Sequence, residues 1–178
     1  MMQLGAEFGL SWGLPQIIVL LVAAQRVIEL GIAKENAAQL LAKGASELGA
    51  RHYPLFTLLH GSWLVALLVL VPADAKVSAW LMALFCLLQI GRVWVIATLG
   101  RYWTTRVITL PDAPLVRRGP YRFIKHPNYL IVTLEIAVLP LAFGAWWLAV
   151  VFSLLNAALL FHRIRIENTA LQPREALS

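Results

Sequence analysis

Five stretches of mostly apolar residues alternate with shorter polar segments along the chain. They cover residues 14–33, 53–71, 77–99, 128–143 and 145–161. A helix of about 20 apolar residues crosses the hydrocarbon core of a bilayer. The pattern therefore predicts an all-α integral membrane protein, a single domain over residues 1–178 with about five transmembrane helices. The last two stretches are separated only by Gly144, which predicts a tight helical hairpin.

The amino-acid composition supports this class of protein. Of the 178 residues, 60% are apolar and 13% are charged, whereas soluble domains contain about 45–50% apolar and about 25% charged residues. A chain of this length cannot bury so much apolar surface in its own core. The composition excludes a water-soluble fold and leaves no room for a large domain outside the membrane.

The basic residues predict the orientation in the membrane. Twelve of the 15 Lys and Arg residues fall after the first span, after the third span and in the tail. Because basic loops stay in the cytoplasm, we expect the N-terminus outside and the C-terminus inside. Basic clusters in a membrane protein contact anionic lipids, so membrane lipids are expected partners and nucleic acid is not. The sequence predicts no oligomeric state.

Four charged residues, and one histidine, fall within the apolar stretches. A charged side chain at mid-bilayer costs at least about 2.5–3.5 kcal/mol on insertion scales. Arg26 and Glu29 are three residues apart and are expected to pair on one helix face. Arg92 and Glu135 lie on different spans, where they either pair or line a pocket open to the cytoplasm. His60 is interpreted as an interior histidine with satisfied hydrogen bonds.

Most of the remaining polar chemistry lies in residues 100–129 and 162–171. In the first segment, Pro127 suits the first turn of a helix. The unpaired backbone N–H groups at the N-terminus of that helix form a candidate binding site for an anion. In the second, Arg163 and Glu167 are four residues apart and are expected to form an ion pair. A basic lipid-contacting loop and a simple ion pair would also explain these segments. The single cysteine excludes a CxxC metal or redox site, and no metal site is predicted.

Two motifs in these segments resemble a known family. Residues 119–129, GPYRFIKHPNY, resemble the GPYR-x-x-[RK]-HPxY signature of the isoprenylcysteine carboxyl methyltransferases, which are integral membrane enzymes. Arg163-Ile164, followed by Glu167 and Leu171, resembles the second signature, RI-x-x-EE-x-x-L. The motifs flank one hairpin and cover roughly the C-terminal half. The stretch from Gly100 to Leu115, and the overlapping run TTRVITLPDAPLVRRGPYR (residues 104–122), also resemble a bacterial subgroup encoded beside type III polyketide synthases.

The resemblance implies S-adenosylmethionine (SAM) as methyl donor, bound by the loop before the fourth span and the end of the fifth. The absence of a GxG motif agrees with a site that is not a Rossmann domain. The implied cofactor-binding residues are Tyr121, His126, Pro127, Asn128, Tyr129, Glu167 and Asn168. Glu167, Arg163 and Arg92 are the expected catalytic residues, either arginine holding an anionic acceptor. Asn168 departs from the family pattern, which has a second acid there.

The implied reaction is methyl transfer to an oxygen of a lipophilic acceptor that arrives laterally from the bilayer. The subgroup favours a hydroxyl of an alkylpyrone-type polyketide lipid. A prenylcysteine carboxylate is the second choice and a phospholipid amine the third. Two other classes stay open: an NADPH-dependent sterol-type reductase, and a small non-enzymatic transporter or scaffold. The expected location is a bacterial cytoplasmic membrane, with the site facing the cytoplasm.

Overall fold

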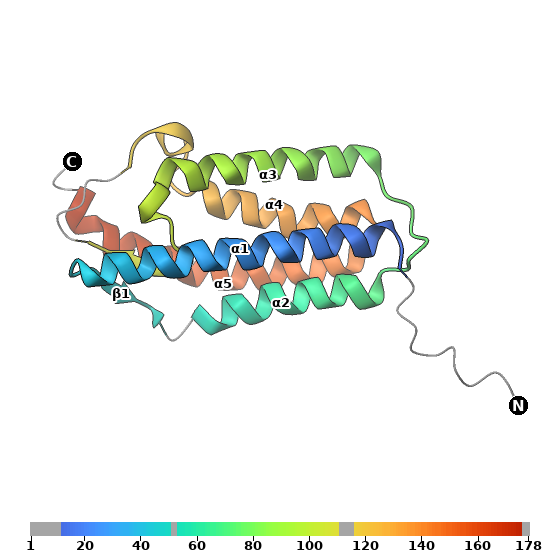
Figure 1. Cartoon of the computed structure of the whole chain (residues 1–178), viewed down its shortest axis with the longest axis horizontal. Helices are drawn as coiled ribbons and strands as arrows, with labels where there is room; N and C mark the ends of the chain where they lie inside the picture. Colours follow the sequence, from blue (N-terminus) through green and yellow to red (C-terminus); the bar gives the residue numbers. More distant parts are fainter. Residues whose placement is uncertain (1–11, 51–52, 111–115, 176–178) are drawn as a thin grey trace, which may run out of the picture.

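The described residues of the computed structural model, 12–50, 53–110 and 116–175, form a bundle of five helices that run side by side (Figure 1). Side chains are described as far as residue 168, so Arg51, residues 111–115 and the side chain of Leu171 lie outside this part. The helices are α1 (Leu14–Ala42), α2 (Tyr53–Leu70), α3 (Ala79–Leu99), α4 (Pro127–Ala142) and α5 (Trp146–Glu175). Each of them overlaps one of the five apolar stretches, and α1 and α5 continue well beyond theirs.

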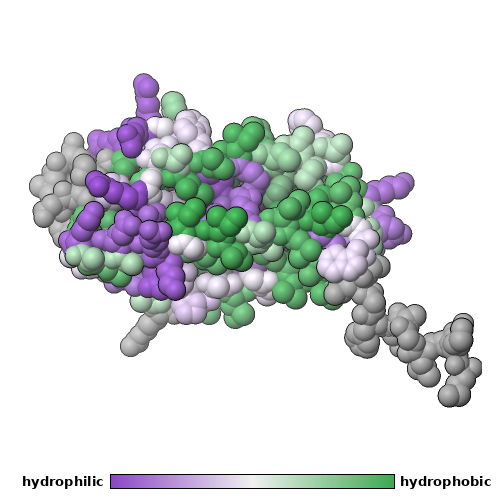
Figure 2. Space-filling view, viewed as in Figure 1, coloured by the Kyte–Doolittle hydropathy of each residue, from purple (hydrophilic) through white to green (hydrophobic). Residues whose placement is uncertain are grey.

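The outer surface of the bundle is apolar over most of its length. Leu58, Ile90 and Leu154 each leave at least two thirds of their surface exposed, which is expected for side chains that face lipid. In Figure 2 the hydrophobic surface covers the middle of the bundle, and hydrophilic residues gather mainly at the end near the C-terminus. The prediction of an all-α integral membrane protein is confirmed.

The helices differ in how well they match a bilayer. By length and composition, α1, α2, α3 and α5 can each cross a membrane. Helix α4 has 16 residues and at 1.5 Å per residue is about 24 Å long, shorter than the roughly 30 Å hydrocarbon core. The fourth apolar stretch is therefore a short helix that packs between α3 and α5.

Two short strands were not expected from the sequence. Strand β1 (Ser46–Leu48) follows α1 and pairs antiparallel with β2 (Val107–Thr109), which follows α3. Across the ribbon, Arg106 forms an ion pair of 3.1 Å with Glu47. The ribbon brings the two loops and the second half of α5 to one end of the bundle. The predicted orientation requires these segments to lie at the same end of the bundle, as they do. The side of the membrane that this end faces stays a prediction.

Helix α1 continues nine residues past the predicted span and positions the loop after α3. The extension is rich in alanine, leucine and other strong helix formers. The Asn36 amide donates hydrogen bonds to the carbonyl oxygens of Trp103, at 2.8 Å, and Gly100, at 3.2 Å. Trp103 follows the 3₁₀ turn Gly100–Tyr102 and is only 2% exposed. The extension therefore holds the loop over the end of the bundle.

The hairpin between α4 and α5 is as tight as predicted. Gly144 adopts a left-handed φ of 74°, which favours glycine because it has no Cβ. The N–H of Ala145 then donates to the Pro140 carbonyl oxygen at 2.9 Å, a bond that closes the end of a helix. Because the turn is so short, α5 packs directly against α4.

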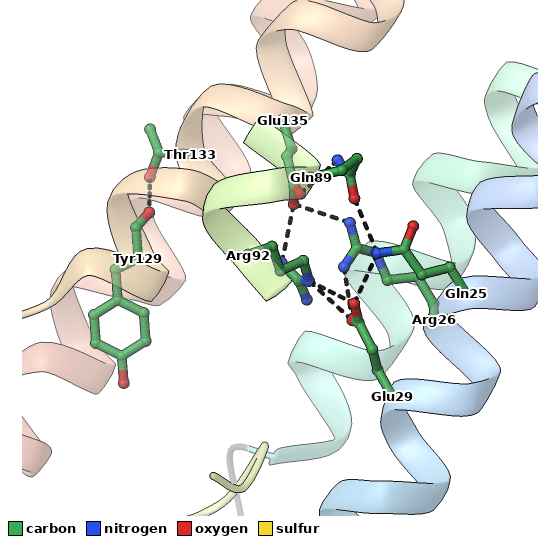
Figure 3. A network of polar contacts seen from close by, with 8 residues as sticks. All are labelled: Gln25, Arg26, Glu29, Gln89, Arg92, Tyr129, Thr133 and Glu135. Carbon is green, nitrogen blue, oxygen red and sulfur yellow. Dashed lines mark hydrogen bonds and ion pairs between the residues drawn. The ribbon is translucent and has the colours of Figure 1, made fainter. Parts of the chain in front are cut away.

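The charged residues inside the bundle form one network, the charge cluster of Arg26, Glu29, Arg92 and Glu135 (Figure 3). Arg26 contacts Glu29 at 2.7 Å and Glu135 at 3.0 Å. Arg92 contacts the same two carboxylates at 2.8 and 3.0 Å. Gln89 also donates to Glu135 at 2.8 Å. Two cations and two anions sum to zero charge, so the cluster joins α1, α3 and α4 without leaving a net charge inside the bundle.

Candidate functional site

The two signature segments meet where α4 begins and α5 leaves the apolar region. The Tyr129 hydroxyl donates to Glu167 and accepts a 2.8 Å hydrogen bond from Arg163 Nε. Arg163 also donates to the Thr105 carbonyl oxygen at 2.7 Å. Among the described ion pairs none joins Arg163 to Glu167 directly. The expected ion pair is replaced by two hydrogen bonds through Tyr129 that connect the two signatures. The bond from Arg163 to Thr105 connects them to the loop after α3.

His126 forms the second connection between the signatures. It is the residue before the first turn of α4, and its ring stacks on Tyr129 with centroids 5.3 Å apart. Its Nε2 lies 3.1 Å from Asn168 Oδ1, and its Nδ1 lies 3.6 Å from a Glu167 oxygen. Asn168, at the position of the family's second acid, thus contacts the histidine of the first signature.

A polar pocket of about 120 Å³ opens beside these residues. It lies between the end of α3, the loop with β2, the 3₁₀ turn Gly119–Arg122 and the facing ends of α4 and α5. Its lining comprises Leu99, Tyr102, Trp103, Thr104, Arg106, Val107, Ile108, Thr109, Tyr121, His126, Asn128, Tyr129, Arg163 and Glu167. Aromatic rings, a carboxylate and two guanidinium groups therefore face one small space.

Several features of this pocket suit a polar ligand. Asn128 Oδ1 is buried and has no hydrogen-bond partner among the described residues. Burial, and then the negative charge of Glu167, raise the pKa of Tyr121 above its usual range, so its phenol stays protonated and can donate. Gly119 has a φ of 57°, and a Cβ there would lie 2.5 Å from Thr98 Oγ1. Glycine thus lets the turn sit directly on α3.

A larger apolar cavity of about 300 Å³ lies beneath the polar pocket, between α1, α2, α4 and α5. Its lining comprises Ala23, Arg26, Val27, Glu29, Leu30, Tyr53, Phe56, Thr57, His60, Gly61, Leu64, Arg92, Trp103, Thr104, Thr105, Asn128, Tyr129, Val132, Leu160 and Arg163. Five residues line both spaces and form their shared wall: Trp103, Thr104, Asn128, Tyr129 and Arg163. A ligand bound in either space could therefore contact these five side chains.

The apolar cavity reaches the side of the bundle between α1 and α2. Val27 and Leu30 of α1 line it and are 68% and 38% exposed. Thr57 and Gly61 of α2 line it from the other side and are also exposed. We call the gap between these four residues the lateral opening. It faces the lipid-exposed surface rather than the hydrophilic end.

The structure distributes the expected site residues unevenly. Tyr121, His126, Asn128, Tyr129, Arg163 and Glu167 line the polar pocket. Pro127 is buried as the first residue of α4, and Asn168 reaches the site only through His126. Arg92 lies apart from them in the charge cluster, where its pairing with Glu135 is observed, and it lines the apolar cavity (Figure 3).

The contribution of α2 to this cavity was not predicted from the sequence. Tyr53, Phe56, Thr57 and His60 all line the apolar cavity. They recur every three to four residues, the spacing that places side chains on one face of a helix. This spacing of aromatic and polar residues, in an otherwise apolar span, was the sequence signal that could have indicated their shared helix face.

The fold and the two spaces define a class: an integral membrane protein with a polar pocket at its hydrophilic end, joined through a shared wall to a cavity that opens to lipid. A family model for the isoprenylcysteine carboxyl methyltransferase (ICMT) family matches residues 80–173. The chain belongs to this family, and membership implies a membrane methyltransferase. Enzymes of the family generally use SAM.

Two relatives extend the similarity beyond the matched residues. The chain is 38% identical over 160 residues to a protein of Bacillus subtilis (strain 168) described as "Uncharacterized protein YpbQ", covering 88% of this chain and 95% of that protein. It is 26% identical over 157 residues to an "Uncharacterized protein" of Haemophilus influenzae, covering 84% and 90%. No solved structure matches the chain.

Proposed function

We propose that this chain transfers the methyl group of SAM, bound in the polar pocket, to an oxygen of a lipophilic acceptor in the apolar cavity. The observation that carries the proposal is the shared wall. Tyr129 and Arg163 belong to the two family signatures and line both spaces. A donor in the polar pocket and an acceptor in the cavity would both reach these residues, so the methyl group and the acceptor oxygen would meet there away from bulk water, as methyl transfer requires.

The residues of the polar pocket suit the polar and cationic groups of SAM. When bound, SAM supplies an electrophilic methyl group on a positively charged sulfonium. Glu167 offers a negative charge, Asn128 offers an unpartnered amide oxygen, and the rings of Tyr121 and Tyr129 suit a cation. His126 and Asn168 hold the two signatures together. Arg163 is positioned to hold an oxygen of the acceptor at the shared wall.

The apolar cavity supports a lipid as the acceptor. Its lining is mostly aliphatic and aromatic, and its lateral opening faces lipid, so a membrane-dissolved molecule would enter from the side of the bundle. An alkylpyrone-type polyketide lipid is the favoured acceptor, ahead of a prenylcysteine carboxylate and a phospholipid amine. The proposed site faces the cytoplasm of a bacterial inner membrane, because the basic segments gather at that end.

Purified protein in detergent is expected to bind S-adenosylhomocysteine (SAH), the product of the donor, in isothermal titration calorimetry. His126→Ala is expected to weaken this binding about tenfold, since it removes a ring that lines the pocket and contacts Asn168 and Glu167. Absence of binding at millimolar SAH would refute the proposal. Oxidation of NADPH in the presence of a sterol-like enone would instead favour a reductase.

The lateral opening is tested by filling it. Gly61 lines the opening, and a Cβ there meets no atom within 4 Å, so Gly61→Leu is expected to fold and to obstruct entry. With a long-chain hydroxypyrone as acceptor, kcat/KM is expected to fall at least tenfold while SAH affinity stays unchanged. Gly31→Leu is the matched control, because Gly31 is equally unobstructed but lies outside the cavity lining. Equal rates in both variants would place the entrance elsewhere.

A further inference from the structure

His60 lies on α2 with its ring in the lining of the apolar cavity. Its Nδ1 is 2.8 Å from the carbonyl oxygen of Phe56. A carbonyl oxygen only accepts hydrogen bonds, so Nδ1 carries the proton and Nε2 of the neutral ring carries a lone pair. Among the described residues none hydrogen-bonds to this Nε2. His60 therefore forms a hydrogen bond through Nδ1, and its Nε2 is left as a hydrogen-bond acceptor within the lining of the cavity.

His60 lines the same cavity as Tyr129 and Arg163 of the shared wall. Phe56 is one turn of α2 away, and its ring centre lies 5.0 Å from the guanidinium carbon of Arg163. Four residues of helix advance by about 6 Å. Arg163 in turn donates to the hydroxyl of Tyr129. A molecule in the cavity can thus contact both His60 and the wall, and its hydroxyl must lie within hydrogen-bond distance of Nε2 for His60 to take its proton.

The other charged groups of the cavity are already engaged. Glu29 forms ion pairs with both Arg26 and Arg92, and the two arginines also share Glu135. A carboxylate held by two guanidinium groups is a poor proton acceptor, because protonation would leave an unpaired positive charge in the interior. Within the described lining of the cavity, His60 is the neutral base that has a lone pair available.

We infer that His60 is the base that receives the proton of the acceptor, and that the acceptor is a long-chain lipid with an enolic or phenolic hydroxyl. This inference rests on the proposed function. The acceptor oxygen forms a bond to the methyl carbon as its O–H bond breaks, and the proton moves to Nε2. The electron pair of the broken S–C bond stays on sulfur, which leaves SAH uncharged. The imidazolium then releases its proton to water. A carboxylate acceptor carries no proton and needs no such base.

Two variants separate the basic nitrogen from the packing of the ring. His60→Phe keeps the volume and removes both nitrogens. His60→Asn keeps an N–H donor for the Phe56 carbonyl but has no basic nitrogen. Ser62→Ala is the matched control, because Ser62 is exposed on the same helix, donates to the Leu59 carbonyl and lies outside the cavity lining.

The probes are 3-pentadecylphenol, pentadecylbenzene, which lacks the hydroxyl, and N-acetyl-S-farnesylcysteine, which offers a carboxylate. We expect SAH-loaded wild type to bind the phenol about tenfold more tightly than pentadecylbenzene, and His60→Phe to lose this preference. Methyl transfer to the phenol is expected to fall at least about a hundredfold in both His60 variants. SAH affinity in these variants, and every property of Ser62→Ala, should stay within twofold.

The outcomes distinguish the inference from the proposed function. If a His60 variant that binds SAH methylates the phenol at the wild-type rate, His60 is not the base and the proposed function stands. If the wild type binds SAH but does not methylate the phenol, whatever it does with the farnesylcysteine, the site takes no hydroxyl and the inference is overturned. If the wild type does not bind SAH, the proposed function itself fails.

Discussion

Replacement of Glu167 by glutamine is expected to weaken SAH binding by about two orders of magnitude. Glu167 lines the polar pocket, accepts a hydrogen bond from Tyr129 and lies 3.6 Å from His126. Hydrogen bonds to a charged group contribute about 1.5–3 kcal/mol, and a hundredfold change in affinity corresponds to about 2.7 kcal/mol. Glutamine keeps the size of the side chain but removes the charge that suits the amino group, which SAM and SAH share. Titration calorimetry measures the affinity directly.

Glu35→Gln is the matched control for this prediction. Glu35 is exposed on α1, where its only described partner is Gln39, at 3.4 Å, so its replacement should leave SAH affinity within twofold. The thermal midpoint of each variant separates loss of binding from loss of folding. Wild-type affinity in Glu167→Gln would show that the carboxylate does not bind the amino group of the ligand, which would then be assigned to another residue.

The charge cluster gives the largest expected effect on stability. Glu135→Leu leaves Arg92 and Arg26 with one carboxylate between them, and an uncompensated buried charge costs about 3–5 kcal/mol. Glu135 is 3% exposed and contacts both guanidinium groups at 3.0 Å, so little water is available to compensate. We expect the free energy of unfolding in mixed micelles to fall by this amount.

The double variant Arg92→Leu with Glu135→Leu is expected to be more stable than either single variant, because it removes one charge of each sign and keeps the 2.7 Å pair of Arg26 and Glu29. Glu47→Gln is the control outside the bundle. Its ion pair with Arg106 is partly exposed, so its loss should cost less than about 1 kcal/mol. If the losses of the two single variants simply add in the double variant, the four charges are not coupled.

The helices and the family were predictable because both signals are local. Each apolar run is long enough to specify a helix, and Gly144 marks the turn between the last two. The two signatures lie in continuous segments, so their residues could be named before their contacts were known. The end of α1 was underestimated because residues 34–42 carry helix formers without the apolar character used to define a span.

The contacts between distant segments were not predictable. Three-residue strands such as Ser46–Leu48 are too short to show an alternating pattern, and their pairing with Val107–Thr109 depends on where two loops meet. The pair of Arg26 and Glu29 was expected from its spacing, but its union with Arg92 and Glu135 depends on how α1, α3 and α4 are set against one another. The free side of His60 likewise follows from the cavity around it.

The polar pocket and the apolar cavity draw much of their linings from different parts of the chain. All residues that line the polar pocket lie between 99 and 167, inside the family match of residues 80–173. Residues 23–64 of α1 and α2, which supply much of the cavity and its opening, precede that match. Under the proposed function, the donor site would stay unchanged while the first helical pair varies. A graft of α1 and α2 from a relative would then exchange much of the acceptor cavity and leave the polar pocket the same.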